Sequence, residues 1–310
     1  MKFVGFVARR VLNTVPAVLA VIVITFAMIR LVPGDPVQVI AGISLDPAVA
    51  AQLRVQLGLD RPLVVQFFSY FAGLLHGDLG TSYLSHQPVS QIISDRLPYT
   101  LILTGAGVGA GLVLSVPIGV LAAVRQLRRR NSGVGFTFAT TVLVATPDFL
   151  LGTLLVAAFG VYVQVFPVAG AQGFSSIVLP ALALGIPLAG IQARVIRSSV
   201  MDALDQPFTR TLRASGLGER RILFRHVLPN ASIPAITLLS VEFGRLLAGA
   251  LIVENIFAWP GLGTTIFESI SNRDLPAVQG QILVIALLIL AINLIVDIAY
   301  RLIDPRIGAT

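Results

Sequence analysis

The sequence predicts an all-α membrane protein with six transmembrane helices and with both termini in the cytoplasm. Its composition, its apolar runs and its distribution of arginines lead to this prediction. The chain has 310 residues, of which 55% are hydrophobic and only 12% are charged, and its mean hydropathy is +0.88. Such a chain is too apolar for an ordinary soluble domain of this length. It contains no cysteine, so disulfides and thiolate metal sites cannot support the fold.

Six apolar runs are long enough to cross the hydrocarbon core, which takes about 20 residues of helix. The first run is too long for the apolar part of a cleavable signal and lacks a small-residue cleavage site, so we expect a retained anchor. The runs lie at about 9–32, 99–124, 134–163, 176–197, 233–257 and 278–300.

Basic residues concentrate in the cytoplasmic loops of membrane proteins, and this rule sets the orientation. Six spans place only Arg30, Arg54, Arg61, Arg96 and Arg273 outside, and Arg245 inside the fifth run. A five-span or seven-span arrangement would break this sorting. The remaining basic residues all fall on the cytoplasmic side: Lys2, Arg9, Arg10, Arg125, Arg128, Arg129, Arg130, Arg194, Arg197, Arg210, Arg213, Arg220, Arg221, Arg225, Arg301 and Arg306.

The outer connection, from about Pro33 to Pro98, is too long for a tight turn. It carries helix signals of its own, with Asp46 before a proline, Gly58 at a stop and Pro62 before an aromatic run. We expect short amphipathic helices at the membrane surface, because long loops with internal structure are usually functional. A passive connector is the alternative.

The cytoplasmic connection, at about 198–232, has a helix, break, helix pattern. Pro207 suits a first helical turn, Gly216 supplies the break, and Glu219 begins a second helix that is predicted to end near Pro229. A short basic helical pair can dock on a partner protein, or it can lie on anionic lipid headgroups. The pattern alone leaves both interpretations open.

This connection resembles the coupling loop of bacterial ABC importer permeases. The resemblance rests on Thr-Arg-Thr-Leu-Arg-Ala-Ser-Gly at 209–216, Leu-Gly-Glu-Arg-Arg at 217–221 and His-Val-Leu-Pro at 226–229. The general family version has Glu-Ala-Ala where this chain has Arg-Thr-Leu at 210–212, which looks like the Arg-Thr-Ala form of the peptide and nickel branch. Leu212 departs from the alanine of that form.

Other stretches resemble the same branch from one end of the chain to the other. The chain is therefore similar to the DppB/OppB-like permease subunit of bacterial peptide or nickel ABC importers. The stretches are Leu31–Pro36, Gly77–Ser82, Val253–Gly263 (Val-Glu-Asn-Ile-Phe-Ala-Trp-Pro-Gly-Leu-Gly), and Asn293 with Asp297, Tyr300 and Asp304–Arg306.

The resemblance implies a type I importer permease (MetI-like) fold in the bacterial inner membrane. It also implies a DppC/OppC-like second permease, two DppD/DppF-like ATPase subunits that bind ATP and magnesium, and an extracytoplasmic substrate-binding protein. Residues 1–98 would form the first span and the outer segment, and residues 99–310 a five-helix core. The residues expected to couple to the ATPase are Pro207, Phe208, Arg210, Thr211, Leu212, Arg213, Gly216, Glu219, Arg220 and Pro229.

Catalytic and nucleotide-binding patterns are missing from the sequence. A Walker A motif needs a lysine, and the only lysine is Lys2. No H-E-x-x-H or G-x-S-x-G pattern occurs, and His76, His86 and His226 are too scattered for a nickel site. The arginines lack aromatic platforms, which disfavours nucleic-acid binding. We therefore expect no enzyme activity, cofactor or metal in this chain, and lipid and protein as its partners.

Charged residues inside the apolar runs are candidates for the pathway or a gate. Glu242 and Arg245 lie three residues apart on one helix face, so they can neutralise one another. Asp148 follows a proline and has no obvious partner in the sequence, and Glu254 lies near the end of the fifth run. An unpaired charge at the bilayer centre costs about 2.5 to 3.5 kcal/mol. A structural ion pair is the alternative for the first two.

The function predicted from these features is import of dipeptides or oligopeptides through a pathway shared with the second permease. Nickel or another small solute is an alternative cargo for the same architecture. A second alternative is an ion-gradient-driven transporter that acts alone, with Asp148, Glu242 and Arg245 as the relay. A membrane scaffold would leave the long structured loops unexplained.

Overall fold

The computed structural model describes residues 2–31, 37, 47–56, 58–128 and 133–303. These residues are almost entirely helical, and their only β pairing is an isolated bridge between Thr81 and Pro88. The predicted all-α class is confirmed. The chain forms two compact units, residues 1–98 with 261–310 and residues 99–260. Val32–Pro36 and Asp304–Arg306, which contribute to the family resemblance, lie outside the described residues.

In unit 2 (99–260), helix α5 (Val89–Arg128) packs closely along α8 (Phe174–Asp205). A Cβ at Gly107 would meet Leu184 Cβ at 2.8 Å, and one at Gly111 would meet Leu188 Cδ2 at 2.5 Å. The glycines therefore let the two helices approach where a side chain would clash. Gly109 does not take part in this contact, because nothing lies within 4 Å of a Cβ there.

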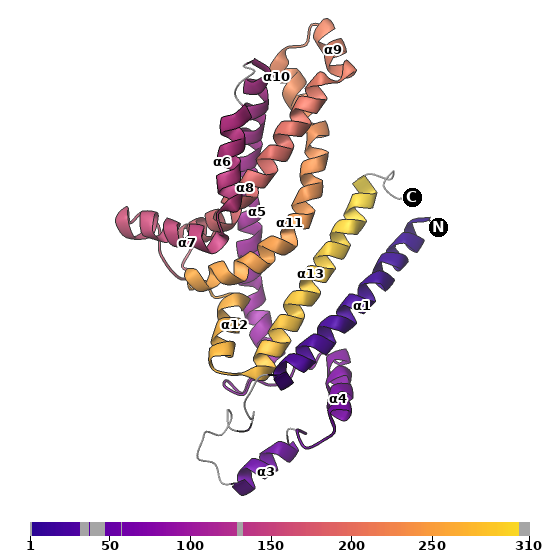
Figure 1. Ribbon diagram of the computed structural model, residues 1–310, viewed down its shortest axis with the longest axis vertical. Coiled ribbons are helices and arrows are strands. Elements are labelled where there is room, and N and C mark those ends of the chain that lie inside the picture. The colour runs from indigo at the N-terminus through magenta and orange to yellow at the C-terminus, as the bar shows by residue number, and fades with distance from the viewer. Residues whose placement is uncertain (1, 32–36, 38–46, 57, 129–132, 304–310) are drawn as a thin grey trace. The chain divides into compact units, whose positions relative to one another are not determined.

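Helix α11 (Leu228–Ile256) runs beside α8, and the two bury two apolar clusters (Figure 1). The first cluster includes Leu184 and Leu188 of α8 with Leu246 of α11. The second includes Ile196 of α8 and Ala231 of α11. Helices α8 and α11 thus pack together at two places. The first cluster also includes residues of the third predicted span, and the second also contacts residues of the coupling loop.

The third predicted span, 134–163, is not one straight helix. It is split into α6 (Gly133–Ala145) and α7 (Asp148–Leu155), which continues as the π-helix η1 (Val156–Tyr162). The two parts meet at an angle of 93°, and Figure 1 shows α7 turning sharply away from α6. Pro147 has φ −60° and ψ 141°, so it leaves the helical conformation. A proline also lacks the N–H that would continue the α6 ladder.

The coupling end of unit 2 differs from prediction at Pro229. Helix α9 (Pro207–Ala214) and α10 (Glu219–Ile222) begin where predicted, but α10 does not end near Pro229. It passes through the π-helix η2 (Leu223–Val227) directly into α11, where Pro229 lies in the first turn. Pro229 has no N–H to donate, yet the chain stays helical on both sides of it.

In unit 1, α1 (Lys2–Leu31) and α13 (Leu275–Ile303) lie side by side (Figure 1). The outer connection forms α3 (Pro47–Gln56) and α4 (Leu63–Leu75), which confirms the predicted short helices. Phe26 of α1 packs edge-on against Phe67 of α4, with ring centroids 5.1 Å apart. Helix α12 (Leu262–Ser271) precedes α13, and α5 begins at Val89, ten residues before the predicted span.

Within the described residues, five helical stretches are long and apolar enough to cross a membrane. The bent pair α6 and α7–η1 passes the same test as one broken span, which gives up to six. The number agrees with the six predicted runs, but the fifth stretch, Glu219–Leu239, begins and ends earlier than the predicted run at 233–257. The predicted division into residues 1–98 and a five-helix core at 99–310 stays a prediction. The two compact units divide the chain differently, because residues 261–310 pack with residues 1–98.

Candidate functional site

The turn between α9 and α10 is built around Gly216. The Leu217 N–H donates to the Leu212 carbonyl at 3.2 Å, and the Gly216 N–H donates to the Arg213 carbonyl at 3.0 Å. This pair of bonds is a Schellman motif, which needs a left-handed residue after the helix. Gly216 supplies it with φ 79°. The break predicted from the sequence is therefore a defined helix stop.

Two side-chain interactions hold α9 in place: one links it to α8, and the other links it across the turn to α10. Thr209 is fully buried, and its hydroxyl donates to the Ala203 carbonyl of α8 at 2.9 Å. Arg213 donates to both carboxylate oxygens of Glu219, at 2.7 and 3.3 Å. The Glu219 hydrogen bond raises the pKa of the Arg213 guanidinium above its ordinary value, so this group stays charged. The sequence did not identify this pair, because six residues across a turn is not a helical spacing.

Most of the predicted coupling residues are exposed at one end of unit 2. Leu212 is half-buried and packs against the α8–α11 cluster, while Phe208 and Phe224 expose 37% and 61% of their surface. The exposed arginines give this surface a positive charge. The exposed residues among those predicted are Pro207, Phe208, Arg210, Thr211, Arg213, Gly216, Glu219, Arg220 and Pro229.

The second part of the site is a charged network between α7 and α11. Arg245 Nε lies 2.5 Å from Glu242 Oε2, as the spacing predicted, and its Nη1 lies 3.5 Å from Asp148 Oδ2. The side chains of Asp148 and Glu242 are 16% and 14% exposed, while that of Arg245 is 43% exposed. The structure thus gives Asp148 the partner that the sequence did not reveal, and the network combines two acidic side chains with one arginine.

A glycine makes room for the Asp148 carboxylate. A Cβ at Gly249 would lie 2.7 Å from Asp148 Oδ2 and 3.5 Å from Leu184 Cδ2. Asp148 is the first residue of α7, where the partial positive charge of a helix N-terminus favours a carboxylate. The break at Pro147 therefore places the N-terminus of α7, and the Asp148 side chain on it, next to α11.

Glu254 is not part of this network. It lies nine residues beyond Arg245 on α11, or about 13 Å along a helix axis. It is fully buried, close to the end of the helix, where its carbonyl accepts the Trp259 N–H at 2.8 Å. The Trp259 indole donates to the Tyr99 carbonyl at 3.0 Å, so this corner of unit 2 is held by buried polar contacts.

Sequence reasoning missed a polar cavity in unit 1. Asp274, which is 3% exposed, accepts a hydrogen bond from the Ser82 hydroxyl and another from the Tyr83 N–H at 3.0 Å. These bonds fix residues 77–88 on the turn between α12 and α13. The Gly77–Ser82 stretch was noted only for its resemblance, and no local pattern links it to a residue about 190 positions later.

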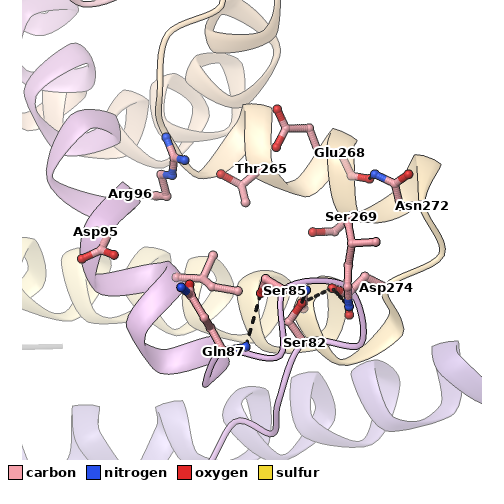
Figure 2. Close-up of a pocket in the computed structure, with 13 residues that line it drawn as sticks. Ser82, Ser85, Gln87, Asp95, Arg96, Thr265, Glu268, Ser269, Asn272 and Asp274 are labelled. Carbon is pink, nitrogen blue, oxygen red and sulfur yellow. Dashed lines mark hydrogen bonds between the residues drawn. The ribbon is translucent and has the colours of Figure 1, made fainter. Parts of the chain in front are cut away.

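The cavity has a volume of about 260 Å³. Figure 2 shows Thr265, Glu268 and Asn272 on one wall and Ser85 with Gln87 on the facing wall. Asp95 and Arg96 of α5 line its side.

Two family models match the chain. The model described as "Binding-protein-dependent transport system inner membrane component" matches residues 115–309, and the corresponding N-terminal model matches residues 3–104. The chain is also 41% identical over 303 residues to the glutathione transport system permease protein GsiC of Salmonella choleraesuis. It is 37% identical to GsiC of Escherichia coli K12. Each alignment covers 98% of this chain and 98% of the relative.

A solved chain of the MetNI methionine ABC transporter, in inward facing conformations, has a similar fold. The TM-score is 0.55 at 17% identity, over 69% of this chain and 97% of that chain. The likeness at this identity concerns the fold alone, and it confirms the predicted importer permease architecture.

Proposed function

Because this chain belongs to the family of binding-protein-dependent transport system inner membrane components, we propose that it is the DppB/OppB-like half of the pathway of a short-peptide importer. At the family level, it is a multi-pass inner membrane permease subunit of an ABC importer. Membership of this family also implies three kinds of partner: a second permease, ATPase subunits and a binding protein. The proposal adds the class of cargo and the roles of particular residues.

The cargo proposal is supported by the relatives. They are named as glutathione permeases, and glutathione is a peptide-type solute. Their similarity extends along almost the whole chain rather than over one segment. We therefore favour a dipeptide or another short peptide over nickel.

The observation that best supports the coupling role is the α9–α10 turn. Its Schellman stop and the Arg213–Glu219 pair hold a short helix with an exposed basic and aromatic surface. Thr209 ties that helix to α8. Closure of the ATPase subunits on ATP would push or pull α9, and α8 would carry the displacement toward the pathway.

The charged network supplies the proposed pathway or gate. An arginine that is 43% exposed in a predicted membrane span needs water or another protein surface, because lipid would leave the charge unsolvated. The Arg245 face of α11 is therefore proposed to look into the pathway shared with the second permease. Glu254 is proposed as a buried support for the outer end of α11.

The coupling role can be tested with two matched glycine variants. Gly216 has φ 79°, whereas Gly218 has φ −69° and ψ 144°, and nothing lies within 4 Å of a Cβ at either position. Valine fits the second conformation and is strained in the first. Gly216→Val should keep membrane insertion but lose most ATP-dependent peptide uptake, while Gly218→Val should retain uptake.

Uptake and ATP hydrolysis should be measured in proteoliposomes that contain the complete importer. Equal and normal uptake by both variants would contradict the coupling role of the turn.

A further inference from the structure

The polar cavity of unit 1 has room for more than ordered water. Its volume of about 260 Å³ compares with about 30 Å³ for one water in the liquid. Two segments far apart in the sequence form it: residues 82–96, which include the start of α5, and residues 265–277, which include most of α12 and the start of α13. Figure 2 shows polar side chains of both segments around the cavity.

The charges of the lining favour a cation. Asp95, Glu268 and Asp274 contribute carboxylates, and Arg96 contributes the guanidinium of the lining. Asp274 is engaged with Ser82 and Tyr83. Asp95 and Glu268 are exposed, and among the described residues neither carboxylate has an ion-pair partner. Two negative groups are therefore available to a positive ligand.

The chemistry of the lining favours an organic cation over a metal ion. In the described part of the chain, no three His, Cys, Asp or Glu side chains are grouped closely enough to hold a metal. Ser85, Thr265 and Asn272 add neutral oxygen acceptors around the opening. An ammonium or guanidinium group has several N–H donors that can use separated acceptors of this kind.

A buried hydroxyl closes one wall of the cavity. Ser269 is 6% exposed and lies 3.3 Å from the side-chain amide of Gln281. With that amide turned by 180°, the Gln281 oxygen, which otherwise has no hydrogen-bond partner, accepts the Ser269 proton. This wall is therefore held by contacts within the protein.

The cavity is placed where a protein can reach it. In the predicted topology, the connection after the first span and the connection after the fifth span lie on the same side of the membrane, opposite the cytoplasmic connection that holds α9. If α9 faces the ATPases, the cavity faces outward. The family is defined by dependence on a binding protein, and in the proposed importer this protein delivers cargo from outside.

We propose that this cavity is a docking socket for a lysine or arginine side chain of the extracytoplasmic binding protein. This inference rests on the proposed import function. The Asp274 hydrogen bonds hold the socket in shape before docking, which limits the ordering cost of binding. The carboxylates attract the basic side chain, and the walls fix its position.

The test is the affinity of the purified binding protein for the complete importer in lipid nanodiscs. Asp95→Asn and Glu268→Gln remove charge while keeping side-chain size. The double variant should bind the binding protein at least about tenfold more weakly at low salt, and added salt should weaken its binding less than that of the wild type. Asp60→Asn, an exposed acid of the same outer connection that is outside the cavity, is the control and should bind normally.

Charge exchange identifies the occupant. Glu268→Arg should be rescued by a binding protein in which one surface lysine or arginine is changed to glutamate. Unchanged binding-protein affinity in the double variant would overturn the socket, as would a loss confined to binding of free peptide. Copurification of the ATPase subunits with every variant tests the importer separately, so failure of the socket and failure of the proposed function give different results.

Discussion

Two arginine–glutamate pairs in this chain use the same chemistry in different surroundings. Arg213–Glu219 holds the α9–α10 turn, with side chains that are 42% and 66% exposed. Arg245–Glu242 lies in α11, where the glutamate is only 14% exposed and Asp148 adds a second acid. An exposed pair contributes about 0.2–1 kcal/mol, whereas a membrane-embedded charge left unpaired costs about 2.5 to 3.5 kcal/mol. We therefore expect the second pair to contribute more to stability than the first.

The largest effect is expected from removal of Arg245. Arg245→Gln leaves Asp148 and Glu242 facing each other without a cation, so we expect about 2–3 kcal/mol of lost stability and near-complete loss of peptide uptake. Thermal unfolding in detergent and uptake in proteoliposomes measure the two quantities.

A neutral network is the control for this variant. Combining Arg245→Gln with Asp148→Asn and Glu242→Gln should recover most of the stability but not the uptake, if the charges serve the pathway. Recovery of both would assign the network to structure alone.

An intermediate effect is expected at Gly249. In Gly249→Ala the new Cβ would lie 2.7 Å from Asp148 Oδ2, so the carboxylate or the helix must shift, at a cost of about 1–2 kcal/mol. Gly109→Ala is the matched control because nothing lies within 4 Å of its Cβ. Equal melting temperatures for the two variants would show that the Asp148 contact is not close.

The smallest effect is expected at the exposed pair. Glu219→Gln should reduce stability by less than about 1 kcal/mol, and added salt should shrink the difference. A loss as large as that of Arg245→Gln would remove the distinction between the two pairs.

The pH dependence of the exposed pair has a defined sign. The pKa of Arg213 is raised in the folded state, so its stabilisation is present below the unfolded-state pKa and is lost only as the pH rises through the folded-state value. Both lie far above neutrality. We therefore expect Arg213 to add no pH dependence to unfolding in the neutral range.

Local signals account for what could be predicted from the sequence. Pro207 and Gly216 mark the ends of α9 because helix starts and stops depend on nearby residues. The Glu242–Arg245 pair follows from helical periodicity. The six apolar runs follow in the same way from the thickness of the membrane.

Long-range packing explains what could not be predicted. Asp148 meets Arg245 only because α7 turns through 93° toward α11, and no local pattern gives that direction. Asp274 meets Ser82 only after α12 and the outer connection have packed. Pro229 resembles a helix stop in the sequence, yet the preceding π-helix carries the chain through it.

We propose that this chain imports short peptides and that ATP hydrolysis in its partner subunits drives the import. The most direct measurement is uptake of a labelled dipeptide into proteoliposomes that hold this chain, the second permease and the ATPase subunits. We expect uptake only when ATP lies on the α9 side and the binding protein on the opposite side. Uptake by this chain alone, driven by an ion gradient without ATP, would contradict it.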